Sequence, residues 1–403
     1  MGHRYAVILF LGLFTALSSF AGGEEPERSS RLFDGAGTYA GATASPSAGA
    51  MDAETLKAEL KKRITFDDHG SARERAGYEA LLSRLLESPT ARAEAEKFIQ
   101  ADLRIAFAFE EMDGTTIATV EGRKTVWGPR GVTYTSRVPP GVALNKAFLD
   151  HEQDVGVGTF AHETFGHAVS ASSLSGDDAA ANRYIVTEEE NARLIGWLVR
   201  TELSVPPEDE TWNYVANPEG SMRGLAMAHP YYSLQLTTDE LRDPLSVYRE
   251  RLVQAEELLA SIPGRERNIE KWGRIVDHFI NAHKMDQSSF RNIRDSLENS
   301  RKALPNTRKT YTDIRDILAQ RIAYFSSEKG RAALELLRKS ADAPFVAERD
   351  AAILANRQKL KDLLAGKTPE STRPPPMAGQ VTWDQLRELL QADQKHCEFG
   401  GVK

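Results

Sequence analysis

The most constraining feature of this 403-residue chain is a pair of histidines five positions apart, with a glutamate directly after the first. The stretch reads Ala-His-Glu-Thr-Phe-Gly-His-Ala, so His162, Glu163 and His167 stand among small and apolar neighbours. In a regular α-helix, residues five positions apart point roughly 140° away from each other. A π-turn, closed by hydrogen bonds between residues five apart, returns them to one face, and Gly166 tolerates such a distortion. We therefore predict a local π-bulge between His162 and His167.

The residue types in this stretch are those of a metal site. Neutral imidazole nitrogens bind Zn²⁺, and an adjacent carboxylate can hold the water that the metal activates. Such a site needs a third protein ligand and leaves one position open. Position 173, six residues after the second histidine, is not a histidine. The acidic candidates are Glu188, Glu189 and Glu190, which follow His167 by 21, 22 and 23 residues.

These three glutamates open a second helix, which the pattern predicts from Thr187 to about Leu203. Glu189, Ala192 and Gly196 share one stripe of that helix, and the small residues would let a neighbouring helix approach closely. Glu189 is therefore the first candidate ligand and Glu188 the second. The alternative is that all three form a solvated first turn.

With these residues in place, the sequence resembles the gluzincins, a branch of the zincin-like zinc metallopeptidases. His162-Glu163 with His167 is similar to the H-E-x-x-H motif with one residue added, and Glu189-Glu190-Asn191-Ala192 is similar to the later E-x-x-A motif. The resemblance covers about residues 155–203. It implies a zinc ion bound by His162, His167 and a glutamate, with Glu163 as the general base of peptide hydrolysis.

A zinc peptidase also needs a hydrogen-bond donor that stabilises the charge developing on the substrate carbonyl. The stretch after Ala228 contains three candidates, His229, Tyr231 and Tyr232. Paired tyrosines after a proline also suit a packing role, so both interpretations stay open. His278 and His283 have no partner at a useful spacing in the sequence, and we interpret them as ordinary surface or core histidines.

The N-terminus has the pattern of an export signal. Basic His3 and Arg4 precede an apolar run, and small residues stand at positions 19 and 21, so residues 1–21 are predicted to be a signal peptide. An uncleaved membrane anchor is the alternative, although the run is shorter than the ~20 residues that a span needs. Residues 22–50 are rich in Gly, Ala, Ser and Pro and are predicted to be a disordered linker. We expect a periplasmic or extracellular protein that meets the membrane only through this signal.

Residues 51–242 are predicted to form the zincin-like catalytic domain. Helices are expected at 52–63, from Ser71 to the Ser88-Pro89 break, and from Thr90 to about Asp102. Four short segments rich in β-branched and aromatic residues follow, at 104–110, 115–120, 123–127 and 132–138. They predict a small antiparallel or mixed sheet beside the histidine helix.

The sequence pattern predicts that the second half of the chain is helical. Residues 243–366 are predicted to be a helical bundle region with turns at Pro263 and Pro305, and 367–403 a Pro-rich linker with a short helix at 383–393. The predicted fold class is thus α+β and mainly helical.

Two hypotheses about function follow. The first is an exported zinc metallopeptidase that hydrolyses peptide or protein substrates. The second is a non-catalytic envelope scaffold or partner-binding helical protein with a degenerate metal motif. A net charge of −7 with dispersed basic residues argues against a nucleic-acid partner. The sequence shows no G-x-S-x-G, Walker or G-x-G-x-x-G motif, and it does not indicate an oligomeric state.

Overall fold

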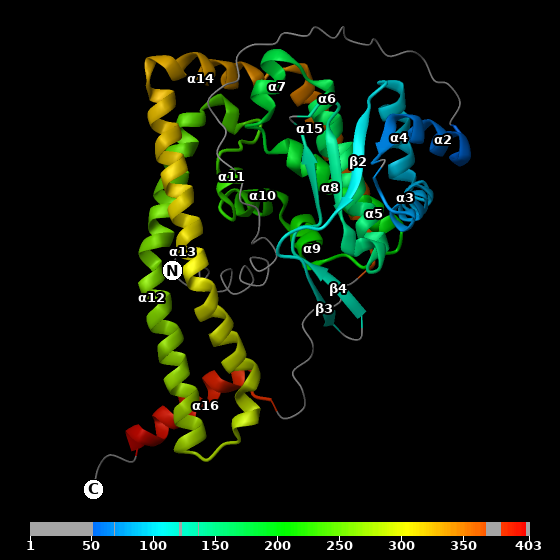
Figure 1. Cartoon of the computed structure of the whole chain (residues 1–403). Coiled ribbons are helices and arrows are strands. Elements are labelled where there is room, and N and C mark those ends of the chain that lie inside the picture. Colours follow the sequence, from blue (N-terminus) through cyan, green and yellow to red (C-terminus); the bar gives the residue numbers. More distant parts are fainter. Residues whose placement is uncertain (1–50, 68, 121–122, 136, 368–379, 400–403) are drawn as a thin grey trace. The chain divides into compact units, whose positions relative to one another are not determined.

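The computed structural model describes residues 51–67, 69–120, 123–135, 137–367 and 380–399 (Figure 1). The predicted signal peptide, the linker at 22–50 and most of the Pro-rich segment lie outside these residues. The fold is α+β and mainly helical, as predicted. The described residues form two compact units. Unit 1 contains the described residues up to 226, together with 234–247 and 323–367. Unit 2 contains 227–233, 248–322 and 380–399.

Unit 1 begins with three capped helices and a short strand. They are α2 (Ala53–Arg63), β1 (Ile64–Phe66), α3 (Ala72–Leu85) and α4 (Pro89–Gln100). The Asp52 carboxylate accepts hydrogen bonds from the first backbone amides of α2, and Ser71 forms a capping box with Glu74 at the start of α3. Ser88 caps α4, so this helix begins at Pro89, one residue earlier than predicted.

The main sheet of unit 1 is mixed and four-stranded. It contains β1, β2 (Ile105–Glu110), β6 (Gly141–Asn145) and β5 (Gly131–Tyr134), in that order. The first three strands are parallel, with Phe107 beside both Phe66 and Val142. Strand β5 runs antiparallel to β6, with Val132 opposite Ala143, and forms one edge of the sheet.

The four predicted strand segments divide between two sheets, one mixed and one antiparallel. Strands β3 (Thr116–Val120) and β4 (Arg123–Trp127) form a separate antiparallel pair, whereas β2 and β5 join the main sheet on either side of β6. Neither β6 nor β1 was among the predicted strand segments. Every residue of β6 is buried, as in a central strand covered on both faces. Such a strand has no alternating pattern by which the sequence could reveal its partners.

The core of unit 1 lies where the sheet meets the helices that carry the motif. Helix α5 (Gln153–Ala161) follows the short 3₁₀ helix η2 (Lys146–Leu149) and continues directly into η3 (His162–Ala168) and α6 (Val169–Ser173). Helix α7 (Gly176–Asn182) then leads to α8 (Thr187–Glu202), which was predicted at this position. The fully buried rings of Phe107 on β2 and Phe160 on α5 meet edge to face at 5.0 Å, which joins sheet and helix.

The end of the helical half returns to unit 1. Unit 1 also contains α9 (Asp209–Ala216), α10 (Pro218–Ala226) and the 3₁₀ helix η4 (Glu240–Arg242). Its last two helices are α14 (Glu328–Ser340) and α15 (Pro344–Leu364), which follow the long helices in the sequence. Ile353 and Leu360 of α15 share a buried cluster with Leu194 and Leu198 of α8. Helix α15 is thus part of the packing that holds α8 in place.

All the regular secondary structure in the described residues of unit 2 is helical. It contains α11 (Pro230–Ser233), most of α12 (Pro244–Asn281), the 3₁₀ helix η5 (Gln287–Phe290), most of α13 (Arg291–Ser326) and α16 (Trp383–Phe399). The turns predicted at Pro263 and Pro305 are wrong, because both prolines lie inside long helices. Each follows a buried residue, Ile262 and Leu304, whose packing offsets the lost hydrogen bond. Helix α16 extends beyond the predicted residue 393.

No helix within the described ranges is both long and apolar enough to cross a membrane.

Candidate metal centre

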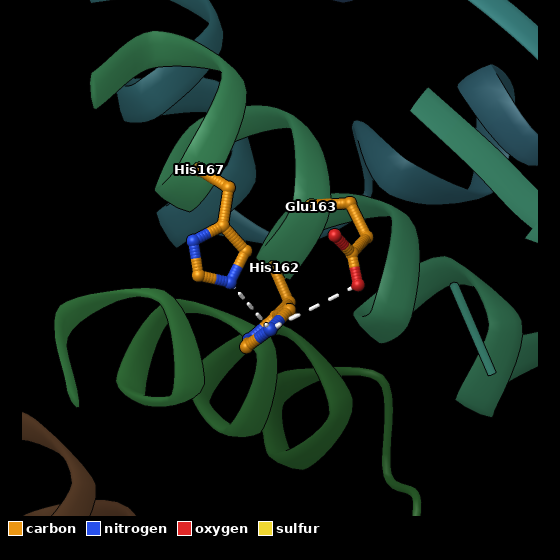
Figure 2. A group of neighbouring side chains, drawn as sticks. All are labelled: His162, Glu163 and His167. Atoms are coloured by element: carbon orange, nitrogen blue, oxygen red, sulfur yellow. Dashed lines mark hydrogen bonds and ion pairs between the residues drawn. The ribbon is translucent and has the colours of Figure 1, made fainter. Parts of the chain in front are cut away.

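The predicted π-bulge is confirmed. Residues His162–Ala168 form a π-helix between two α-helical segments, and this places both imidazoles on one side of the turn (Figure 2). The Nε2 atoms of His162 and His167 lie 3.1 Å apart, and the rings meet edge to face. The extra residue between the histidines is thus accommodated by a wider helical turn.

Glycines and alanine let this π-turn lie directly against α8. A Cβ atom on Gly166 would stand 2.2 Å from the Cβ of Ala192, and one on Gly158 would overlap the side chain of Arg200. A Cβ on Gly196 would stand 3.1 Å from the Cβ of His162. The stripe of small residues predicted on the second helix therefore does face the motif. Gly166 serves this close approach in addition to the helix distortion for which it was singled out.

The close approach brings two glutamates of α8 to His167. The Oε2 atom of Glu189 lies 3.3 Å from Nε2 of His167, on the same side as His162, whereas Oε1 of Glu188 lies 2.7 Å from Nδ1. Glu189 therefore faces the same nitrogen that meets His162, and Glu188 holds the opposite ring nitrogen. A carboxylate on the far nitrogen fixes the orientation and tautomer of a metal-binding histidine. Of the two candidates, Glu189 is therefore the one that faces the nitrogen of His167 shared with His162, and Glu188 contacts the opposite nitrogen.

The third glutamate of the turn points elsewhere. Glu190 is buried, accepts a hydrogen bond from the hydroxyl of Tyr214, and also accepts one from Nε of Arg357 on α15 at 2.9 Å. Glu190 thus joins α8 to α9 and α15. The solvated first turn that was the alternative interpretation is not found, since Glu189 and Glu190 are 4% and 3% exposed.

Glu163 lies beside the two imidazoles and is held by the edge strand. Its Oε1 atom is 3.9 Å from Nε2 of His162 (Figure 2), and its Oε2 atom accepts a 2.7 Å hydrogen bond from the hydroxyl of Thr133 on β5. The Thr133 hydroxyl also lies 3.1 Å from the Glu163 backbone carbonyl. Sequence reasoning missed Thr133, and the only signal for it was its place in a predicted strand next to the motif. Glu163 is therefore oriented by the sheet.

Charges around the site set the protonation of its members. Burial lowers the pKa of His162. Burial also opposes the charged form of His167, but the carboxylates of Glu188 and Glu189 outweigh it and raise the pKa of His167 well above its usual range. Burial disfavours ionised Glu189 too, yet Arg193 and His167 hold the pKa of Glu189 well below its usual value. His167 and Glu189 thus form a buried ion pair.

Arg193 was not among the predicted site residues. Its Nε atom donates a 2.6 Å hydrogen bond to Oε1 of Glu189, and its guanidinium also pairs with Glu210 of α9. This contact leaves Oε2 of Glu189 turned toward His167. Arg193 therefore positions the third candidate ligand.

Two separations among His162, His167 and Glu189 match those expected around a tetrahedral zinc ion. Ligand atoms about 2.0–2.1 Å from zinc lie roughly 3.3 Å from one another. The separations here are 3.1 Å between the histidine nitrogens and 3.3 Å between His167 and Glu189. Glu163 is also close, since an oxygen of its carboxylate and the two imidazole nitrogens lie within 4.8 Å of one another. Its Oε1 atom lies 3.9 Å from Nε2 of His162, which is longer than the roughly 3.3 Å expected between two zinc ligands.

The remaining predicted residues lie in unit 2. The rings of Tyr231 and Tyr232 are 5.3 Å apart, and those of His229 and Tyr232 are 5.9 Å apart, so the three form one small cluster. Burial lowers the pKa of His229. Their role as oxyanion donors stays a prediction.

No protein-family model, curated protein or solved structure matches this chain.

Proposed function

We propose that this protein is an exported, zinc-dependent metallopeptidase. The observation that carries the proposal is the π-turn, which brings two imidazole nitrogens 3.1 Å apart, with the carboxylate of Glu189 3.3 Å from His167 and that of Glu163 3.9 Å from His162. His162, His167 and Glu189 would hold the zinc ion. Export rests on the N-terminal sequence, and cleavage after Ala21 predicts a mature protein that begins at Gly22 on N-terminal sequencing.

Glu163 is the general base in this proposal. A bound zinc ion would supply Lewis-acid polarisation of the scissile carbonyl and lower the pKa of the attacking water. Glu163 accepts the proton from that water and delivers it to the leaving amine. The hydrogen bond from Thr133 keeps its other oxygen fixed, so the proton is taken by the oxygen nearer His162.

A peptide substrate fits the position of β5. This strand is the edge of the main sheet, and Gly131 lies so close to Glu163 that an added Cβ would be 2.9 Å from the Cγ of Glu163. An extended peptide can pair with an exposed strand edge through its backbone. Pairing along β5 would carry successive peptide bonds past the general base, which supports an unfolded peptide or protein segment as the substrate.

The test is a substitution that separates chemistry from metal binding. Glu163→Gln is expected to retain one tightly bound zinc ion at the site and to lower turnover by about 10²–10⁴-fold, the usual contribution of a general base. His162→Ala is expected to lose activity and the zinc ion bound at this site. Activity is followed as new N-termini in a mixed peptide library by mass spectrometry, and zinc by elemental analysis.

Glu219→Gln is the matched control, because Glu219 is an exposed glutamate on α10. It should leave both readouts unchanged. Full peptidase activity in Glu163→Gln would contradict the role of Glu163 as the general base. Protein that binds no zinc at His162 and cleaves no peptide would favour the scaffold hypothesis.

A further inference from the structure

The structure brings together a second pair of histidines that is also five residues apart. His278 lies in the last turn of α12, and His283 follows the end of that helix, close to Lys284 with its positive φ of 56°. Their rings lie 5.2 Å apart and nearly perpendicular. Because the chain turns after the helix ends, the two rings converge without a π-turn.

A carboxylate from a distant part of the sequence completes this cluster. On α16, Oδ2 of Asp393 lies 3.1 Å from Nε2 of His278, and Oδ1 lies 3.1 Å from Nε2 of His283. One ligand atom from each of the three residues falls within 4.8 Å of the other two. The sequence interpretation of these histidines as residues without a partner is therefore wrong. The partner is 115 residues away from His278, beyond the reach of any spacing rule.

The three side chains are held on a packed frame. A buried cluster joins α12, α13 and α16 through Phe279, Phe290, Ile293 and Leu386. The rings of Trp272 on α12 and Trp383 on α16 meet edge to face at 5.5 Å. His283 also lies against the ring of Phe279, with ring centres 5.2 Å apart. The position of Asp393 relative to both histidines is thus set by packing within unit 2.

The cluster is open to solvent on the side of the imidazoles. The side chains of His278 and His283 are 47% and 44% exposed, whereas that of Asp393 is 20% exposed. An ion can therefore reach the three donors without any rearrangement of the core, and water can fill the remaining coordination positions. Two imidazoles with one carboxylate favour a borderline divalent transition metal over Mg²⁺ or Ca²⁺, which prefer all-oxygen sites.

We propose that His278, His283 and Asp393 form a second binding site, for a divalent transition-metal ion such as Zn²⁺, that fastens α16 to the end of α12. The ion replaces the two histidine–aspartate hydrogen bonds with coordination by the same three side chains. This site needs no part of the proposed peptidase centre, since all three residues belong to unit 2.

The experiment counts zinc ions in the full-length protein and follows α16 directly. Zinc titration by calorimetry is expected to show two sites in the unaltered protein, one in the double variant His278→Gln/His283→Gln, and one in His162→Ala. Asp393→Asn, which keeps the size of the side chain, should weaken the second site by about tenfold or more. Hydrogen exchange of the α16 amides should slow when zinc is added to the unaltered protein, and should not respond in the double variant.

The hydrogen-exchange measurement also shows whether the double variant is still folded. The histidines are partly exposed, so the double variant should keep the exchange pattern of α12 and α13. Equal zinc stoichiometry in the unaltered protein and the double variant would overturn the proposal, and so would zinc binding without any slowing of exchange in α16. Either result leaves the proposed peptidase centre untouched, because His162→Ala and Glu163→Gln test that centre separately.

Discussion

The two histidine pairs have the same spacing in the sequence, yet the structure brings each together in a different way. Between His162 and His167 the chain stays helical and widens into a π-turn, and the side chains are about four-fifths buried. Between His278 and His283 the helix ends, and nearly half of each side chain is exposed. The difference shows that a five-residue spacing has no fixed meaning. Its geometry depends on whether a neighbouring helix requires the segment to remain helical.

The carboxylates around the two pairs differ as well. The first pair receives Glu188 and Glu189 from one helix turn and Glu163 from its own turn. Glu163 is held by Thr133, and Glu189 is held by Arg193. The second pair shares the single carboxylate of Asp393. Buried, supported ligands lose less freedom on binding a metal, so the first site should bind zinc more tightly.

The largest expected difference between the sites is the stabilisation by zinc. At a free zinc concentration about 1,000 times the dissociation constant, a site stabilises the folded protein by about 4.1 kcal/mol, and at about 100 times by about 2.7 kcal/mol. At one zinc concentration, His162→Ala should therefore lose more of the zinc-dependent rise in melting temperature than His283→Ala, as measured by calorimetry with and without a chelator. His69→Ala, at an exposed histidine outside both clusters, should behave like the unaltered protein. A larger loss in His283→Ala would reverse the ranking.

The next effect tests the close helix contact that distinguishes the first pair. Gly166→Ala places a methyl group 2.2 Å from the Cβ of Ala192, which must push the π-turn away from α8. We expect a loss of about 1–3 kcal/mol in the free energy of unfolding, together with weaker zinc binding at the first site.

Gly224→Ala provides the matched helical control. A Cβ atom at Gly224 of α10 meets no atom within 4 Å, so this change should raise stability by about 0.5–1 kcal/mol. Urea unfolding measures both variants. A stable Gly166→Ala protein with normal zinc binding would show that the contact with α8 does not position His167.

The smallest effect concerns the ionic frame around the first pair. Glu208 accepts hydrogen bonds from Arg130, just before β5, at 2.8 Å and from Arg200 of α8 at 3.0 Å. Burial opposes its ionisation, but Arg200 and Arg130 outweigh burial and lower the pKa of Glu208 to about 2. Because the folded pKa lies below the unfolded value, this carboxylate stabilises the fold above about pH 4.5, and the contribution is lost as the pH falls toward 2.

Glu208→Gln should therefore destabilise the protein by about 1–2 kcal/mol at neutral pH, with a difference that shrinks between pH 4.5 and 2. Chemical denaturation at several pH values provides the measurement, with Glu219→Gln as the control. A difference that stays constant over this range would mean that the charge of Glu208 does not support the fold.

Much of the first site was predictable because its parts are close in the sequence. The helix distortion followed from the position of two histidines alone, and the stripe of Glu189, Ala192 and Gly196 followed from helical periodicity. Both are local patterns, in which residue spacing maps directly onto direction around a helix. The choice between Glu188 and Glu189 was open in the sequence, because adjacent residues differ only in rotation and the packing of two helices decides it.

The failures occurred where distant segments meet. Turns were predicted at Pro263 and Pro305, yet the packing of the neighbouring buried residues keeps α12 and α13 continuous. The sequence did not indicate that β2 and β5 pair with β6, because a fully buried strand does not alternate between apolar and polar residues. The contact of Thr133 with Glu163 depends on that pairing.

The sequence by itself determined the fold class, the π-turn and the set of chemical groups available at His162, Glu163, His167 and the acidic turn. These depend on residue type and on neighbours within one or two helical turns. Tertiary structure alone decided which glutamate contacts Nε2 of His167 and which strand holds Glu163. It also decided that Asp393 contacts His278 and His283. Those contacts arise from packing between segments tens to more than one hundred residues apart, and loop closure over such distances leaves no periodic signal in the chain.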